Sequence, residues 1–255
     1  MKWREHRRIT KYIAKTLGVS NELANKLAES SILPDITPDF GLNVRVTKRG
    51  NLNVRESRIQ HHSETAKTWA WKYLYKARRQ YLTGDPRWVE SLGRAVHYIQ
   101  DYTVSKHHTV LKFIKLKSWE THNEIENGLS KVPIPREEII KASKVPVSAN
   151  FIKSELQRLS PKESIEEVMK EATYMTTLAM KSVLRPTKPK ELERNFNRAL
   201  KRHLLLVGIP IAGAITSYIF GYGTYSIILL GVSALFHVLD SNFHKWNLER
   251  RWFYP

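Results

Sequence analysis

The sequence predicts an all-α fold: a bundle of several helices, followed by an apolar helical hairpin near the C-terminus. Two observations support this prediction. Apolar residues recur at helical spacing in several segments before residue 185, which is typical of helices that bury one face. Residues 204–220 and 224–239 are two uncharged stretches, separated by the short sequence Gly-Tyr-Gly.

The composition limits the kinds of site that the chain can build. It has 255 residues and no cysteine, which excludes a disulfide framework and any thiolate zinc site. A metal site would therefore need histidine, aspartate and glutamate. The formal net charge of +18 favours polyanionic partners: nucleic acid, an anionic membrane surface or a phosphorylated substrate. A basic surface that faces only solvent would give the same excess of lysine and arginine over aspartate and glutamate. The N-terminus is charged from Lys2, so we expect no signal peptide.

The first elements are two helices and a hairpin. Residues 4–17 have an apolar stripe at four-residue spacing, and Gly18 ends this predicted amphipathic helix. A second, short helix begins at Ser20 or Asn21. Residues 44–55 alternate apolar and polar side chains around a Gly-Asn turn, which predicts a small hairpin or a long polar loop.

Between these segments, residues 30–43 contain two prolines, two aspartates and a glycine. This composition predicts an ordered loop rather than a helix. Loops held by a rigid scaffold often carry function, so Asp35 and Asp39 are candidate ligands. Aspartate after proline is also common in ordinary turns.

Longer helices follow. Residues 57–82 predict a helix with His61 and His62 near its start, and its aromatic stripe fits a core face better than a base-stacking platform. Thr83-Gly84-Asp85-Pro86 predicts a break, and the next helix covers residues 86–104. Shorter helices are predicted over 108–117 and 118–130.

The segment after Pro133 and Pro135 carries no chemical signature and predicts packing helices. Two short helices are expected at 136–144 and 148–159. Ser160-Pro161-Lys162-Glu163 has the pattern of a capping box, and predicts the start of a helix that runs to about Leu184.

The two uncharged stretches predict a membrane helical hairpin, although each is slightly shorter than the ~20 residues that usually span a bilayer. Lysine and arginine flank both ends, which places both ends and the rest of the chain on the cytoplasmic side. A buried hairpin of a soluble protein, or an oligomer interface, is the alternative. We therefore divide the chain into a helical domain, a basic connector, the hairpin and a basic-aromatic tail: residues 1–186, 187–203, 204–240 and 241–255.

The stretch from residue 95 to 126 carries the chemistry. His97 and Asp101 are four apart, His107 follows six residues later, and His122 and Glu126 are again four apart. Residues four apart share one face of a helix, so each pair can offer an imidazole and a carboxylate to one metal ion. One such pair alone is usually a surface pair or a satisfied core histidine, but two pairs around His107 favour a cluster of divalent metals.

This arrangement resembles the zinc-dependent phospholipase C family, which shares its site with the fungal single-strand-specific nucleases. The blocks HYIQDYTVSKH and HNEIE carry the resemblance, and select His107 rather than His108. The likeness extends over roughly residues 3–130, from the first helix through the Pro-Asp loop. The terminal glutamate, Glu126, resembles the phospholipases more than the nucleases.

The resemblance implies a set of ligands. A central zinc would be held by Asp35, by His61 or His62, and by His97, with Asp101 bridging to a neighbouring ion.

A second zinc would be held by His107, His122 and Glu126. The family's third zinc uses a histidine of the first helix, here His6, with the amine and carbonyl of an N-terminal tryptophan exposed by processing. Trp3 follows Met1-Lys2 and no leader is visible, so two ions are expected and the third stays open.

The implied activity is zinc-dependent phosphodiester hydrolysis. Asp35 would be a ligand, a base that orients the attacking water, or both. The first candidate function is hydrolysis of phospholipid headgroups at the inner leaflet of a membrane. The alternatives are a nuclease with the same chemistry, and a non-catalytic membrane scaffold stabilised by its metals.

Overall fold

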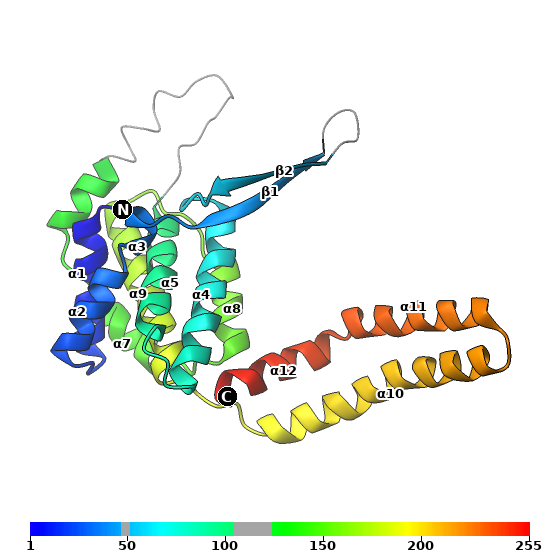
Figure 1. The fold of residues 1–255 in the computed structure, drawn as a ribbon. Coiled ribbons are helices and arrows are strands. Elements are labelled where there is room, and N and C mark those ends of the chain that lie inside the picture. The colour runs from blue at the N-terminus through cyan, green and yellow to red at the C-terminus, as the bar shows by residue number, and fades with distance from the viewer. Residues whose placement is uncertain (47–51, 105–123) are drawn as a thin grey trace. The chain divides into compact units, whose positions relative to one another are not determined.

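The computed structural model describes residues 1–46, 52–104 and 124–255 (Figure 1). Helices dominate these residues and strands β1 and β2 form one antiparallel pair, so the prediction of an all-α fold is confirmed. The chain divides into two compact units. Unit 1 comprises Met1–Val147 and Phe151–Thr187, and unit 2 comprises Ser148–Asn150 and Lys188–Pro255.

The helices up to residue 187 follow the predicted order closely. They are α1 (Trp3–Thr16), α2 (Asn21–Ser30), α3 (Leu33–Ile36), α4 (Glu64–Leu82), α5 (Trp88–Thr103), α7 (Arg136–Lys144), α8 (Ala149–Arg158) and α9 (Ile165–Leu184). Residues 124–128 are also helical and lead into a 3₁₀ turn, Leu129–Lys131. The rest of the two helices predicted over 108–130 lies outside the described residues.

Helix α5 is the centre of unit 1. Helices α2, α4 and α9 all pack against it, and apart from Arg94 its side chains from Ser91 to Thr103 are buried. A helix buried on nearly every side is usually apolar all round, but α5 also buries His97, Gln100 and Asp101. These polar side chains need hydrogen-bond partners from the surrounding segments.

The predicted hairpin is longer than its sequence pattern indicates. Strand β1 (Phe40–Val46) pairs with β2 (Leu52–Arg58), from Phe40 opposite Arg58 to Val46 opposite Leu52. The helix predicted from residue 57 therefore begins only at Glu64, because the strand pairing continues to Arg58. Residues 59–63 form the turn that carries His61 and His62.

Two further local predictions are wrong. The segment 30–43 is not all loop, since Leu33–Ile36 forms the short helix α3, with Pro34 in its first turn. Helix α9 begins at Ile165 rather than after Ser160. The Ser164 side chain accepts a hydrogen bond from the backbone N–H of Glu167, so the N-cap lies four residues later than predicted.

Unit 2 contains α10 (Leu192–Ile219), α11 (Gly223–Leu239) and α12 (Ser241–Phe253). Helix α10 packs along α11 and also contacts α12. The last part of the predicted basic connector, from Leu192, is therefore already helical. The buried carboxylate of Glu249 accepts hydrogen bonds from Ser148 and from the backbone N–H groups of Ala149 and Asn150, which holds residues 148–150 against α12 within unit 2.

Many large apolar side chains of α10 and α11 are exposed, including Leu205, Ile209 and Leu230. By length and composition α10 can cross a membrane, and only 17 % of its apolar window is buried. Helices α11 and α12 are long and apolar enough to cross a membrane only when they are taken together as one span. They are bent by 55° at their junction. One or two helices of this length and composition also occur as core helices of soluble proteins, where they are mostly buried.

Candidate metal centre

Four side chains from three separate segments of unit 1 converge near the C-terminal end of α5. They are Asp35 of α3, His61 of the turn before α4, and His97 and Asp101 of α5. Each offers one nitrogen or oxygen atom, and these atoms all lie within 4.8 Å of one another. We call these four residues the central cluster.

The ligand atoms of the central cluster lie close enough together to surround one ion, at distances of 2.9 to 3.8 Å that bracket the spacing around tetrahedral zinc. His97 Nε2 lies 2.9 Å from His61 Nδ1 and 3.2 Å from Asp101 Oδ2. His61 Nδ1 lies 3.1 Å from Asp101 Oδ2 and 3.4 Å from Asp35 Oδ1, and His97 Nε2 lies 3.8 Å from the same Asp35 atom. Zinc bonds of about 2.0–2.2 Å place tetrahedral ligand atoms roughly 3.3–3.6 Å apart. Two imidazoles and two carboxylates are also ligand types that zinc accepts.

His97 is oriented by the backbone of another helix. Its Nδ1 atom lies 2.9 Å from the carbonyl oxygen of Ser31, the residue that follows α2. Because a carbonyl only accepts, Nδ1 carries the proton and Nε2 presents its lone pair to the cluster. Gly93, one turn before His97, allows this contact: a Cβ at Gly93 would lie 2.3 Å from Ser30 Cβ and 2.5 Å from its carbonyl carbon.

The second oxygen of Asp101 faces a different group of donors. Asp101 Oδ1 lies 2.6 Å from the amino nitrogen of Met1 and 3.0 Å from His6 Nε2. The Met1 nitrogen also lies 2.6 Å from Glu126 Oε1. We call Met1, His6 and Glu126 the N-terminal set. Asp101 thus stands between the central cluster and this second group, as a bridging carboxylate would.

His6 is held in place by Gln100. Its Nδ1 atom lies 2.7 Å from Gln100 Oε1, while Gln100 Nε2 donates to the hydroxyls of Thr10 and Thr176, each at 3.2 Å. These two bonds fix the amide so that its oxygen accepts from His6. His6 Nε2 is then buried 3.0 Å from Asp101 Oδ1 with its lone pair facing a carboxylate and no donor beside it, an arrangement that fits a metal ligand.

The segment that carries Glu126 is tied to α1. Arg8 pairs with the buried carboxylate of Glu5 at 2.7 Å. The same guanidinium donates to the carbonyl oxygens of Leu129 and Val132 at 2.8 and 3.1 Å. These bonds place the turn after residues 124–128 beside α1, and so bring Glu126 to the end of the chain where Met1 and His6 lie.

The charges of the two groups depend on one another. Burial alone would raise the pKa of Asp101, but the Met1 ammonium and the imidazoles of His97 and His6 hold that pKa well below its usual value. Burial lowers the pKa of the Met1 amine, but Asp101 and Glu126 raise it by more, so it stands above its ordinary value of 8.0. The carboxylate of Asp101 is therefore ionised, as a ligand must be.

Three other candidates from the sequence have different surroundings. His62 lies outside the central cluster, with Nδ1 2.8 Å from the backbone carbonyl oxygen of Asp101, so it supports the end of α5. Asp39 accepts hydrogen bonds from Tyr73, Tyr98 and Arg94. Trp3 is 49 % exposed at the start of α1.

The predicted ligands His107 and His122 lie outside the described residues. The zinc that the sequence assigns to them with Glu126 stays a prediction.

Sequence reasoning missed three contributors to the site: the Met1 amine, Gln100 and the carbonyl oxygen of Ser31. The Met1 and Ser31 groups belong to the backbone, which a search for ligand side chains passes over. Gln100 carries a weak signal, because it lies between His97 and Asp101 on a helix that is buried nearly all round.

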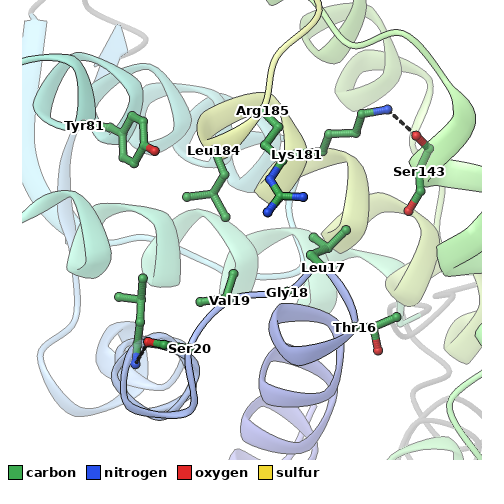
Figure 2. A pocket seen from close by; sticks show the side chains of 11 residues that line it. Thr16, Leu17, Gly18, Val19, Ser20, Tyr81, Ser143, Lys181, Leu184 and Arg185 are labelled. Atoms are coloured by element: carbon green, nitrogen blue, oxygen red, sulfur yellow. Dashed lines mark hydrogen bonds between the residues drawn. The ribbon is translucent and has the colours of Figure 1, made fainter.

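A cavity of about 550 Å³ lies elsewhere in unit 1, at the C-terminal ends of α1, α4 and α9 (Figure 2). Thr16, Tyr81 and Arg185 are among its lining residues. Lys181 spans one side of it and donates to the carbonyl oxygen of Ser143. No residue of the central cluster or the N-terminal set lines it, so this cavity is not the approach to the metal centre.

Comparison with known proteins agrees with this geometry. Residues 6–174 match the family model described as zinc dependent phospholipase C, which covers more than half of the chain. The match includes His6 and all four residues of the central cluster. No curated protein and no solved structure gives a significant match.

Proposed function

Because this chain belongs to the zinc-dependent phospholipase C family, we propose that it is a zinc-dependent phosphodiester hydrolase that acts on phospholipid headgroups at a membrane. The observation that carries the proposal is the central cluster, in which two imidazoles and two carboxylates bring their ligand atoms within 4.8 Å of one another.

One ion would be held by Asp35, His61, His97 and Asp101. A second would be held by the other oxygen of Asp101 and by the N-terminal set, with the Met1 amine in the place that the family gives to a processed tryptophan. A third, from His107, His122 and Glu126, is implied by the resemblance to the family. Zinc bound there would neutralise charge on the phosphate oxygens and lower the pKa of a coordinated water.

The protein's own residues determine where a phosphate can approach. His6 and His97 are fully buried, whereas the side chains of Asp35 and Glu126 are 22 % and 17 % exposed. The substrate would reach the centre from the side of these two carboxylates. Asp35 can then hold the attacking water and accept its proton, in addition to being a ligand, because solvent reaches it.

The membrane part of the proposal is supported by unit 2. The exposed apolar side chains of α10 and α11 would be covered by lipid, and Lys201 and Arg202 stand immediately before the apolar stretch. Basic residues beside such a segment favour anionic lipid on the cytoplasmic side. We therefore propose that the chain is attached to a membrane with its metal centre on the cytoplasmic side.

The first experiment tests the chemistry on a water-soluble chromogenic phosphodiester with added zinc. We expect turnover by the full chain, and a loss of at least 100-fold in His97→Ala together with a lower zinc content per chain. His244→Ala, which changes an exposed histidine of unit 2, is the control. It should keep both the turnover and the zinc content of the full chain. Equal turnover in the two variants would exclude the proposed site.

The second experiment compares substrates. Headgroup release from phospholipid vesicles is measured beside cleavage of single-stranded DNA, and the proposal expects the former to be faster. Faster cleavage of DNA would instead establish the nuclease alternative, which the net charge of +18 favours. Full zinc content without turnover of either substrate would identify a non-catalytic scaffold.

A further inference from the structure

The β1–β2 hairpin carries four exposed apolar side chains. Phe40, Leu42, Leu52 and Val54 are 52, 75, 70 and 54 % exposed. The register pairs even-numbered residues with one another, as in Phe40 opposite Arg58 and Leu42 opposite Glu56. Because side chains alternate across a strand, these four residues lie on one face of the hairpin. We call it the even face.

The opposite face packs on unit 1 at the base of the hairpin. A Cβ at Gly41 would lie 2.7 Å from Ile59 Cδ1 and 3.8 Å from a ring atom of Trp69, so the backbone of β1 approaches these side chains closely. Ile59 is buried, and its N–H donates to the carbonyl oxygen of Asp39 at 2.9 Å. The even face therefore points away from the helices that support the hairpin.

The hairpin is joined directly to the metal centre. Helix α3, which carries Asp35, precedes β1, and the turn with His61 follows β2. Arg58, on the even face at the base, has its guanidinium 4.0 Å from Asp35 Oδ1. In Figure 1 the hairpin leaves unit 1 at the end where α3 and the N-terminus lie. A surface that contacts the even face is thus brought beside Asp35.

The charge next to the even face favours an anionic surface. The two strands contain Arg45, Arg55 and Arg58, and Glu56 is the one acid among their described residues, so the hairpin as a whole is basic. Arg58 and Glu56 lie on the even face, and the exposed Arg55 lies on the opposite face. An exposed apolar face with basic neighbours is the combination that binds lipid interfaces, where apolar groups enter the acyl boundary and cations meet phosphate.

We propose that the even face of the β1–β2 hairpin docks into the surface of an anionic phospholipid bilayer and holds the metal centre against its headgroups. This inference rests on the proposed function, because that function names phospholipid headgroups as the substrate. It assigns a role to a part of the chain separate from the apolar helices of unit 2, since the hairpin belongs to unit 1 and adjoins the site.

The lack of cysteine permits a direct test in the full chain. Leu42→Cys places a single environment-sensitive fluorophore on the even face, and Arg55→Cys, on the opposite face, is the matched control. Both proteins are reconstituted in phosphatidylcholine–phosphatidylglycerol vesicles that contain a lipid-linked quencher. We expect at least threefold stronger quenching at residue 42 than at residue 55.

Other results of the labelling experiment would overturn the proposal. Equal, weak quenching at both positions would show that the hairpin stays in water. Protection of residue 42 from both the lipid-linked and a water-soluble quencher would show that the even face contacts a protein surface, such as a second copy of the chain.

An activity measurement separates this inference from the proposed function. The double variant Leu42→Ser/Leu52→Ser is expected to lose at least tenfold in headgroup release from vesicles, while hydrolysis of the water-soluble phosphodiester stays unchanged. Unchanged vesicle activity would refute the docking. If the parent chain hydrolyses neither substrate, the proposed function fails, and the labelling experiment still decides whether the even face meets lipid.

Discussion

Asp101 connects the central cluster and the N-terminal set through one buried carboxylate. Its Oδ2 atom faces His61 and His97, and its Oδ1 atom faces His6 and the Met1 amine. Each of these neighbours needs a hydrogen bond or an ion pair of its own, because a buried polar group without one is costly. The residues around the ligands are therefore as important to the centre as the ligands themselves.

Gln100 is the clearest example of such a supporting residue. In Gln100→Leu, His6 Nδ1 loses its acceptor, and nothing then fixes which ring nitrogen faces Asp101. Loss of an outer partner of a metal ligand typically weakens metal binding by about 10–100-fold. We expect a decrease of this size in zinc affinity, measured by competition with a chromogenic chelator. Gln157→Leu, at an exposed position, should leave the affinity unchanged.

The Met1 amine gives a prediction for pH. In a chain that starts at Met1 and holds no metal, folding raises the pKa of the Met1 ammonium above its ordinary value of 8.0. The ammonium therefore contributes fully to the stability of the folded state below about pH 8. That contribution is lost as the pH rises through the pKa of the ammonium in the folded state. The melting temperature of the metal-free chain should therefore fall as the pH rises above about 8. A chain extended by two residues before Met1 should lack this fall, and an equal fall in both chains would contradict the contact.

Some of these residues could be predicted from the sequence and others could not. The four-residue spacing of His97 and Asp101 already places both on one face of a helix. The contact between His97 and Ser31 joins positions 66 residues apart, and that between Met1 and Asp101 joins positions 100 apart. No local pattern records such pairs, because they depend on how the helices pack.

Among the elements, α2 and α5 make an unusually close contact. A Cβ at Gly93 would overlap both the side chain and the backbone of Ser30. Gly93→Ala should force the two helices apart, at a cost of about 1–3 kcal/mol, and should pull the Ser31 carbonyl away from His97. We expect a lower melting temperature and weaker zinc binding. Gly208→Ala adds a Cβ to a helix where no atom of another segment lies within 4 Å of it. This variant should keep the melting temperature and the zinc affinity of the parent chain.

The local predictions that are wrong have physical reasons. Residues 57–58 belong to a helical pattern that runs to residue 82, but the cross-strand pairing with Phe40 and Gly41 takes them into β2. Ser160 and Ser164 each precede an acidic residue three positions later, and the sequence does not decide between these two caps. Ser164 prevails because Lys162 N–H donates instead to the carbonyl oxygen of Thr103.

For the whole molecule, metal binding should stabilise unit 1. A ligand that binds only the folded state at 100 times its dissociation constant adds about 2.7 kcal/mol. For a unit of this size, that corresponds to roughly 5–10 °C in melting temperature. We expect a fall of this size when a chelator removes the metal, measured by calorimetry on the full chain in detergent. His97→Ala should show no response to the chelator, and an equal response would place the metal elsewhere.

The long separations within the centre also determine when it can form during synthesis. His6 and Met1 leave the ribosome first, but Asp101 and Glu126 are made about a hundred residues later. At 5–20 residues per second, roughly 5–20 s pass before the amine and the imidazole can meet their carboxylate partners. The part of the chain that is made first is therefore fixed among the last, and the centre closes only after α5 and the segment with Glu126 have emerged.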